Sequence, residues 1–573
     1  MLRDGRETEP GAEVDCDVCI VGAGPAGLTA AAEFLDGEIR VVVLESGAFE
    51  PDAATQLLSR CTVEENEDLY PDPYWSHDRG VGGTSSQWDV LIKGRPHVHL
   101  MPLDPIDFRK RPWVPHSGWP IDERELGRYV LRAQLAADAG PFDYRPQAWM
   151  DDACKPFASS QLATRMVSFG HQEHFQKTLP QRVVESRNVT LMTWSTAVEL
   201  EGARNGEAVT AIRVACLDGR RFRMKPRMII LAQGAFEVPR LLLASRSIHE
   251  AGLGNQNDLV GRFLMDRQIV RAGTLVPASP GGLRRFAFYD MRLAQDRHVL
   301  GKLTLSENVV EAEGLLGNLI SFAPLERFSA YQLAHRPFGR GTTYRSPAHH
   351  SLRTLAAAWR QKRFPPPDVL QHFRRIAAGL DDLFYVKVMR RMKYRPEFNF
   401  DSLGWHAAEN FERRFSTLEV HQMCEQSPDY GNRVTLGAAL DATGLPQAHV
   451  IFRWNGLDAY SIVRTQDKLK EELARAGIGA LKLERRGGQP LLAQMSAHHP
   501  SGTTRMDSSP RRGVVDPACR VHGVNNLFIA SSSVFPTSGY APPTLTILAL
   551  TIRVCDQIKS RMRAPDLFET PPS

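Results

Sequence analysis

Near its start the chain reads Val18-Cys19-Ile20-Val21-Gly22-Ala23-Gly24-Pro25-Ala26-Gly27, a β-branched run that leads into a glycine turn. An alanine-rich stretch follows as far as Phe34 and predicts a helix. Residues 41–44 predict a second strand, which ends at Glu45. A strand, a GxGxxG turn, a helix, a second strand and an acidic residue in this order are typical of a dinucleotide-binding βαβ unit.

Each glycine of this turn has its own task. Gly22 permits the tight turn, Gly24 lets the backbone approach a pyrophosphate without a Cβ in the way, and Gly27 lets the helix pack closely on the strand. The free N–H groups and the positive dipole end of the helix favour phosphate binding. Glu45 is placed to accept a hydrogen bond from a ribose hydroxyl. The cofactor-binding residues predicted for this unit are Gly22, Gly24, Ala26, Gly27, Glu45 and Ser46.

Length and composition indicate a folded chain of several domain-sized units. The 573 residues are 42% hydrophobic and 24% charged, which excludes intrinsic disorder. A prior of about 150 residues per domain suggests three to four such units. The net charge of +5 is too slight over this length to indicate a nucleic-acid binder. We find no apolar run approaching the roughly 20 residues that a membrane span needs.

The N-terminal segment and the cysteines predict a cytoplasmic protein. Residues 1–17 are charged and lack the apolar stretch of a secretory signal. The eight cysteines are scattered, and the CxxC pair of Cys16 and Cys19 has no second Cys or His pair beside it. We therefore expect free thiols in a reducing compartment and no metal site.

The segment 335–395 differs from the rest of the chain because it is rich in Arg and Lys and poor in acidic residues. Residues 352–359 and 369–392 have helical periodicity and are separated by the prolines 365–367. One interpretation is a solvated helical insertion or lid. The alternative is a docking surface for an acidic partner, for an anionic group of the substrate or for a membrane surface.

Two C-terminal motifs connect the chain to a known family. They read His498-His499-Pro500-Ser501-Gly502-Thr503 and Gly539-Tyr540-Ala541-Pro542-Pro543-Thr544. With these motifs, the N-terminal glycine turn and a second glycine-rich loop at Gly82–Trp88, the chain resembles the glucose–methanol–choline (GMC) family of FAD-dependent oxidoreductases. It is nearest in style to the pyranose-oxidase-like, sugar-oxidising branch. The similar motifs follow the family's order along most of the chain, with residues 335–395 outside the resemblance.

The resemblance implies a fold with two lobes. One is a discontinuous α/β FAD-binding domain of the Rossmann type, built from residues 12–100, 185–268 and 500–564. The other is an α+β substrate-binding domain with an antiparallel sheet, built from residues 101–184 and 269–499. The basic helical segment 335–395 is an insertion in this second lobe.

The resemblance also implies how FAD is held. Val198 would contact the adenine edge through its backbone, while Gly83 and Thr84 would lie along the pyrophosphate or ribityl. Pyranose-oxidase-like members have a histidine that bonds covalently to the flavin where this chain has Gln87, so we expect noncovalent FAD. The residues implied to bind FAD outside the first unit are Gly83, Thr84, Ser85, Trp88, Val198, Gly234, Ala530, Ser531 and Thr544.

The expected chemistry is the oxidation of a hydroxyl group. Hydride leaves a carbon readily only when the adjacent O–H proton is removed, so a base must lie within hydrogen-bond reach of the hydroxyl. Histidine suits this task because its ordinary pKa lies near neutrality. In the family the base lies three residues before a Gly-Thr pair, which is His499 here, and His498 is the competing candidate. The expected substrate is a small sugar, aminosugar or polar natural-product scaffold, and an external acceptor, oxygen or another, takes the electrons.

One position departs from the family's pattern. Members normally have Asn or His just before the Pro-Thr of the closing motif, where its side chain hydrogen-bonds the substrate oxygen, and this chain has Pro542. Proline has no side-chain donor. Either another group supplies the contact, with His498, Tyr540 and Asp89 as candidates, or the fold serves a diverged flavin reaction such as a lyase, elimination or desaturation reaction.

Overall fold

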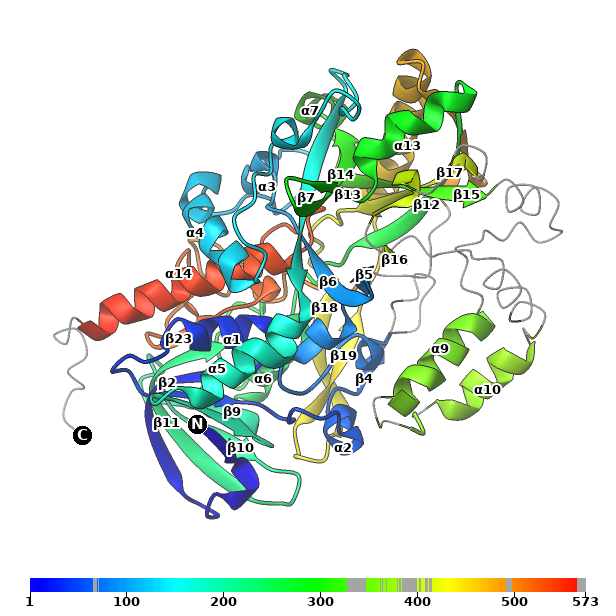
Figure 1. Ribbon diagram of the computed structural model, residues 1–573. Helices are drawn as coiled ribbons and strands as arrows, with labels where there is room; N and C mark the ends of the chain where they lie inside the picture. Colours follow the sequence, from blue (N-terminus) through cyan, green and yellow to red (C-terminus); the bar gives the residue numbers. More distant parts are fainter. Residues whose placement is uncertain are drawn as a thin grey trace.

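The structure, a computed structural model, is built on two large β-sheets with helices around them (Figure 1). It describes residues 1–573 apart from 65–69, 71, 327–346, 361, 363, 367, 379, 381–382, 384–398, 401–402, 408–410, 412–414, 491–496 and 564–573.

The first sheet contains the predicted βαβ unit. Its strands are β1 (Leu2–Asp4), β2 (Glu13–Val21), β3 (Val41–Leu44), β8 (Val189–Thr193), β9 (Thr196–Gly202), β10 (Val209–Ala215), β11 (Arg221–Leu231) and β23 (Leu527–Ile529). The order is β1-β8-β3-β2-β11-β10-β9, and β23 runs parallel to the C-terminal end of β11. Strands β1, β8, β3, β2 and β11 are parallel. Val18, Cys19 and Ile20 are completely buried, as expected for a central parallel strand covered on both faces.

Helices from distant parts of the chain meet beside this sheet. Helix α1 (Pro25–Ala32) contacts both α5 (Leu179–Glu185) and α14 (Thr544–Arg563), and α4 (Glu123–Ala136) packs on α14. Helix α6 (Gly234–Ala244) packs against β9. The red C-terminal helix α14 therefore lies next to the blue N-terminal helix α1 in Figure 1.

The second sheet is largely antiparallel, in the order β16-β5-β6-β7-β14-β15-β17-β12-β20, with β13 beside β14. The strands are β5 (Val90–Ile92), β6 (Arg95–Leu100), β7 (Leu162–His171), β12 (Gln268–Pro277), β13 (Arg292–Ala294), β14 (Arg297–Leu305), β15 (Asn318–Glu326), β16 (Asn399–Phe400), β17 (Phe415–Cys424) and β20 (Gly479–Leu483). A separate three-stranded sheet joins β18 (Arg433–Leu440), β19 (Pro446–Ile451) and β4 (Cys61–Val63).

The strand pairing changes two of the expected domain boundaries. Strands β5 and β6 lie within the segment 12–100 assigned to the FAD-binding domain, yet β6 pairs with β7 in the second sheet. Strand β1 precedes residue 12 and still belongs to the first sheet. Hairpin pairing with a strand more than 60 residues away is not visible in local sequence, so these boundaries need correction. The remaining division into two lobes stays a prediction.

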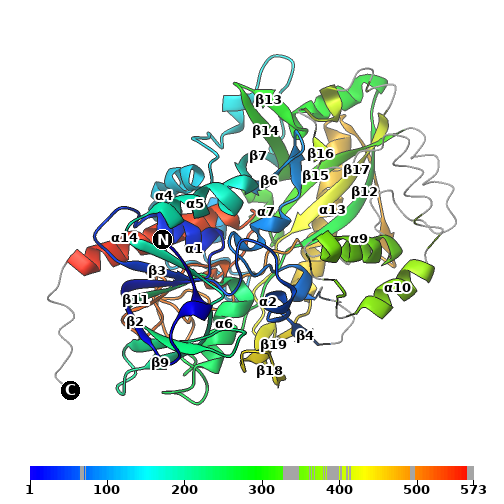
Figure 2. The same cartoon turned by 60° about the horizontal axis from the view of Figure 1, so that its bottom comes forward.

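The described part of the basic segment is a pair of helices, α9 (Pro347–Arg360) and α10 (Val369–Ala378). They lie side by side at the margin of the molecule in both ribbon views (Figure 2). His372 and Ser351 face each other between them, with Nδ1 and Oγ 3.1 Å apart, while Arg374 and Arg375 are exposed. Much of the expected basic surface falls on 335–346 and 384–395, outside the described residues. Within the described ranges, no helix is long and apolar enough to cross a membrane.

Candidate active site

A cavity of about 560 Å³ is lined by residues of both large sheets. This lies within the range of roughly 300–1,000 Å³ that is typical of ligand sites. Its wall combines the glycine turn after β2, the loop between residues 76 and 90, strand β6, the start of α6, residues 497–500 and 530–532, and the start of α14. Most of the predicted site segments therefore meet at one place.

The glycine turn has the close contacts that its motif predicts. Gly22 has a φ of +102°, in the left-handed region that favours glycine. A Cβ on Gly27 would lie 1.8 Å from the carbonyl oxygen of Gly22, so only glycine allows the helix to pack here. A Cβ on Gly24 would meet only the Cα of Gly83, at 3.9 Å, and Gly24 lines the cavity. The two glycine-rich loops therefore pack together and leave bare backbone facing the cavity.

Glu45 holds this turn in shape. Its Oε2 accepts a hydrogen bond from the N–H of Ala23 at 2.9 Å, and its Oε1 accepts one from the N–H of Gly47 at 3.0 Å. Burial raises the pKa of Glu45, and these two hydrogen bonds oppose the rise. The carboxyl group also lines the cavity, so it is placed both to order the loop and to contact a ligand.

Three helices begin at the cavity wall. Ala26 of α1, Gly234 of α6 and Thr544 of α14 all line it. Helix N-termini present free N–H groups and partial positive charge, which stabilise anionic groups. Nothing lies within 4 Å of where a Cβ on Gly234 would stand. Within the described residues, Oε1 of Gln233 is buried without a hydrogen-bond partner, and Gln233 lines the cavity. This wall suits a ligand that carries both anionic groups and hydrogen-bond donors.

The second glycine-rich loop is tied to its surroundings by amide side chains. Nε2 of Gln176 donates a hydrogen bond to Oγ of Ser85 at 2.8 Å. Nε2 of Gln87 donates to Oδ1 of Asp78 at 2.7 Å. Gln87 and Trp88 both line the cavity. The loop is therefore ordered by hydrogen bonds to residues outside it.

His499 is fixed through its backbone. Its N–H donates to Oδ1 of the buried Asp266 at 2.8 Å, and His498 before it has a left-handed φ of +56°. Burial, with a smaller contribution from the charge of Arg267, lowers the pKa of His499 well below its ordinary value. Nδ1 of His499 is buried without a hydrogen-bond partner among the described residues. The imidazole is therefore neutral at pH 7 and able to accept a proton.

Pro542 lines the cavity, and the structure separates the candidates for the contact it cannot make. Tyr540 is buried away from the cavity wall, and its hydroxyl donates a hydrogen bond to the carboxylate of Asp104. Asp89 and His498 do line the cavity, and both are exposed to solvent. Tyr540 is therefore ruled out as the second polar group, because its hydroxyl is directed elsewhere.

Two histidines on β6, His97 and His99, also line the cavity. Neither was predicted as a site residue from the sequence. Burial is the main cause that lowers the pKa of His97 to about 4 and that of His99 to about 3. The signal available in the sequence was the alternation His97-Val98-His99, since alternate residues of a strand share a face.

The structure places most of the predicted residues at the cavity and two of them elsewhere. Gly27 lies behind the turn, in contact with Gly22, as its packing task requires. Val198, expected at the adenine edge, is buried in β9 and is not among the lining residues, whereas Thr196 and Ala197 are. The predicted residues that line the cavity are Gly22, Gly24, Ala26, Glu45, Ser46, Gly83, Thr84, Ser85, Trp88, Gly234, His498, His499, Ala530, Ser531 and Thr544.

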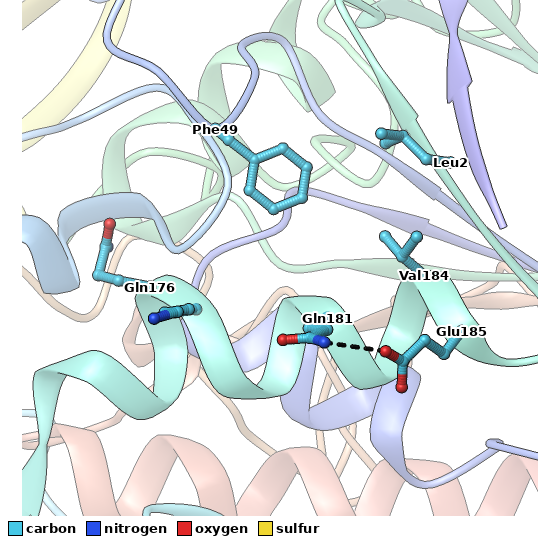
Figure 3. Close-up of a pocket in the computed structure, with 7 residues that line it drawn as sticks. Leu2, Phe49, Gln176, Gln181, Val184 and Glu185 are labelled. Carbon is cyan, nitrogen blue, oxygen red and sulfur yellow. Dashed lines mark hydrogen bonds between the residues drawn. The ribbon is translucent and has the colours of Figure 1, made fainter.

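A second pocket, of about 320 Å³, lies at the surface between β1 and α5 (Figure 3). Phe49, Leu2 and Val184 form much of it, and the amide of Gln181 donates a hydrogen bond to Glu185 at 2.9 Å. Its charged lining residues are Lys177 and Glu185, and none of the predicted site residues lines it. Across the part of the chain that the structure covers, no cluster of three or more His, Cys, Asp or Glu side chains could hold a metal ion.

Comparisons with known proteins agree with this geometry. Residues 428–551 match the GMC oxidoreductase family. The chain is 23% identical to 6'''-hydroxyparomomycin C oxidase of Streptomyces lividus, over 98% of this chain and 94% of that protein. It is 22% identical to 2-methyl-1,2-propanediol dehydrogenase of Mycolicibacterium austroafricanum, over 95% of each. The crystal structure of a formate oxidase has a TM-score of 0.51 at 17% identity, over 98% of this chain and 100% of that one, which shows a shared fold.

The residues present fit FAD. Gly24 and Gly234 leave bare backbone where a side chain would intrude, and the helices that begin beside them favour a pyrophosphate. The unpartnered Oε1 of Gln233 can accept a hydrogen bond from a ligand. With the family match over residues 428–551 and the relatives that align along nearly the whole chain, these observations agree on one assignment. The chain contains a match to the GMC oxidoreductase family over residues 428–551, resembles oxidases and dehydrogenases along nearly its whole length, and is an FAD-dependent oxidoreductase.

Proposed function

We propose that this enzyme oxidises a hydroxyl group of a sugar, an aminosugar or another polar natural-product scaffold. The observation that carries the proposal is that a neutral histidine, His499, lies on the wall of the same cavity as the glycine turn and the starts of α1, α6 and α14. The names of two relatives support the substrate class, since hydroxyparomomycin and 2-methyl-1,2-propanediol both carry hydroxyl groups.

In this reaction the bound FAD supplies the acceptor for the hydride equivalent. The chain's own residues bind and orient the substrate and handle its proton. His499 accepts the hydroxyl proton on its imidazole ring, because burial keeps that ring in its basic, neutral form. Asp266 accepts a hydrogen bond from the backbone N–H of His499. This contact fixes the position of the backbone that carries the imidazole ring.

Anaerobic mixing with a panel of hexoses, polyols and aminoglycosides tests the reaction class. We expect a substrate from this panel to bleach the flavin and to yield one equivalent of carbonyl product per flavin, because no other acceptor is present. The alternative, a lyase, elimination or desaturation reaction, is supported by Pro542 at the position of the usual second catalytic residue. For a lyase or elimination, turnover of substrate while the flavin stays oxidised would contradict our proposal. For a desaturation, a product with a new carbon–carbon double bond and an unchanged hydroxyl would do so.

We further propose that FAD is held noncovalently. Gln87 has no nucleophilic ring nitrogen, and its amide is engaged by Asp78. Precipitation of the purified protein with acid should therefore release all of the yellow colour into the supernatant. Colour that remained on the washed precipitate would show a covalent bond, and peptide mapping would locate it.

The partners and the location of the enzyme also remain proposals. The electrons pass to an external acceptor, oxygen or another, and the exposed Arg374 and Arg375 of α10 are available to an acidic partner. All eight cysteines are unpaired thiols, which supports a reducing, cytoplasmic compartment.

A further inference from the structure

The cavity needs a polar group that the C-terminal motif does not supply. Pro542 carries no donor, and the hydroxyl of Tyr540 is bound to Asp104 behind the wall. A substrate oxygen that loses its proton gains negative charge, and a donor aimed at that charge stabilises the transition state. Such a donor must come from another part of the cavity wall.

Strand β6 places His99 on that wall. His99 lies opposite Phe169 of β7 in the register of the second sheet, and it lines the same cavity as His499 and Pro542. It is near enough to His499 that its charge would lower the pKa of that residue. The two histidines come from different segments of the chain, strand β6 and residues 497–500, and border the same cavity.

The charge state of His99 suits a hydrogen-bond donor. Burial lowers its pKa to about 3, and the ammonium group of Lys302 on β14 adds to the effect. Lys302 is itself engaged by Oγ of Ser321, at 2.7 Å from Nζ. At neutral pH His99 is therefore an uncharged imidazole, which has one N–H donor and one acceptor nitrogen. His499, also neutral, offers the acceptor nitrogen that the hydroxyl proton needs.

Two other polar residues on the wall, His97 and Asp89, fit this task less well. Nδ1 of His97 lies 2.8 Å from the carbonyl oxygen of Arg95, and its ring packs on His171 with centroids 4.4 Å apart, so its orientation is already set. Asp89 is exposed and would carry a negative charge, which repels an oxygen that becomes anionic. His498 adjoins the base in the chain and is exposed, whereas His99 comes from a different segment of the wall and has a neutral imidazole.

We propose that His99 is the second catalytic residue of this enzyme, whose N–H donates a hydrogen bond to the substrate oxygen from which His499 takes the proton. No covalent bond of His99 forms or breaks. The proton moves from the substrate oxygen to His499, and the hydrogen bond from His99 strengthens as that oxygen becomes negative. The inference rests on the proposed function, because it requires a hydroxyl substrate.

Replacement of His99 by Phe and by Gln tests the proposal. His99→Phe keeps a ring of similar size without a donor, and we expect anaerobic flavin reduction by the panel substrate that reduces the native enzyme fastest to slow by roughly 10²–10³-fold. His99→Gln keeps an N–H donor and should stay within about tenfold of the native rate. His171→Phe, on β7 outside the cavity lining, is the matched control and should change the rate less than threefold.

Two readouts do not depend on turnover. Calorimetry on the FAD-loaded protein should show that the carbonyl product binds at least tenfold more weakly to His99→Phe, since the product oxygen occupies the same position. The dissociation constant for FAD should change less than twofold. Loss of FAD or of thermal stability in both the Phe and Gln variants would show a structural role and overturn the proposal.

The outcomes separate this proposal from the proposed function. A native rate in His99→Phe together with a large loss in His499→Ala would refute the task assigned to His99 and leave alcohol oxidation standing. Equal losses in His99→Phe and His99→Gln would also refute it, since a donor alone should rescue. Turnover by the native enzyme with an oxidised flavin would refute the proposed function itself.

Discussion

Replacement of His499 by Ala should slow anaerobic flavin reduction by roughly 10²–10⁴-fold, the range for a lost general base. FAD should stay bound, because the cofactor wall is built by other lining residues, those of the glycine turns and the helix starts. Stopped-flow absorbance under nitrogen measures the loss. In the native enzyme, the rate should be flat from pH 8 down to pH 6, since burial lowers the pKa of His499 well below its ordinary value and acid must protonate it before activity falls.

Two control variants accompany this prediction. His522→Ala makes the same chemical change outside the cavity, at a ring whose Nε2 lies 2.9 Å from the carbonyl oxygen of Asp507, and should leave the rate within about threefold. His498→Ala tests the competing candidate. A larger loss in His498→Ala than in His499→Ala would reverse the assignment of the base, and no loss in either would contradict it altogether.

Replacement of Gly27 by Ala should damage the fold itself. The new Cβ would stand 1.8 Å from the carbonyl oxygen of Gly22, so backbone must move, and we expect a loss of about 3 kcal/mol or more, the upper end for overpacking in a core. The melting temperature of the FAD-free protein should fall with it. The measurement is the unfolding transition with and without added FAD.

Gly24→Ala is the matched change, at another glycine of the same motif. Its Cβ would meet only the Cα of Gly83, at the ordinary distance of 3.9 Å, and would face the cavity. The FAD-free protein should therefore keep its melting temperature, while FAD binds at least tenfold more weakly, which corresponds to about 1.4 kcal/mol. Equal melting temperatures for Gly27→Ala and Gly24→Ala would contradict this division of tasks between the two glycines.

Local chemistry made much of the first sheet predictable. The run from Val18 predicted β2, and residues 41–44 predicted β3 with the bounds that the structure shows. The spacing of the glycines predicts this turn because each position excludes a side chain. Gly22 adopts a left-handed φ, and Gly27 lies too close to the carbonyl oxygen of Gly22 for any Cβ. The C-terminal motif also allowed His499 to be predicted, because its position relative to the Gly-Thr pair is the one the family resemblance implies for the base. His499 lines the cavity.

Long-range pairing explains what the sequence left open. The hairpin of β5 and β6 joins the second sheet because β6 pairs with β7, a strand far along the chain. That His97 and His99 line the cavity could therefore not be predicted from the local sequence. The failure of Tyr540 as a donor depends on Asp104, more than 400 residues away. The backbone contact expected of Val198 stays a prediction, while the neighbouring Thr196 and Ala197 line the cavity.

The position of β11 between β2 and β23 has a consequence for biosynthesis. These neighbours leave the ribosome about 500 residues apart, which at roughly 5–20 residues per second means a delay of about 25–100 s. During that interval the nascent chain exposes an unfinished edge along the end of β11, and the last helix has yet to emerge. Flavin capture must therefore wait for residues 527–563, and deletion of β23 and α14 should abolish it even though the glycine-rich beginning is intact.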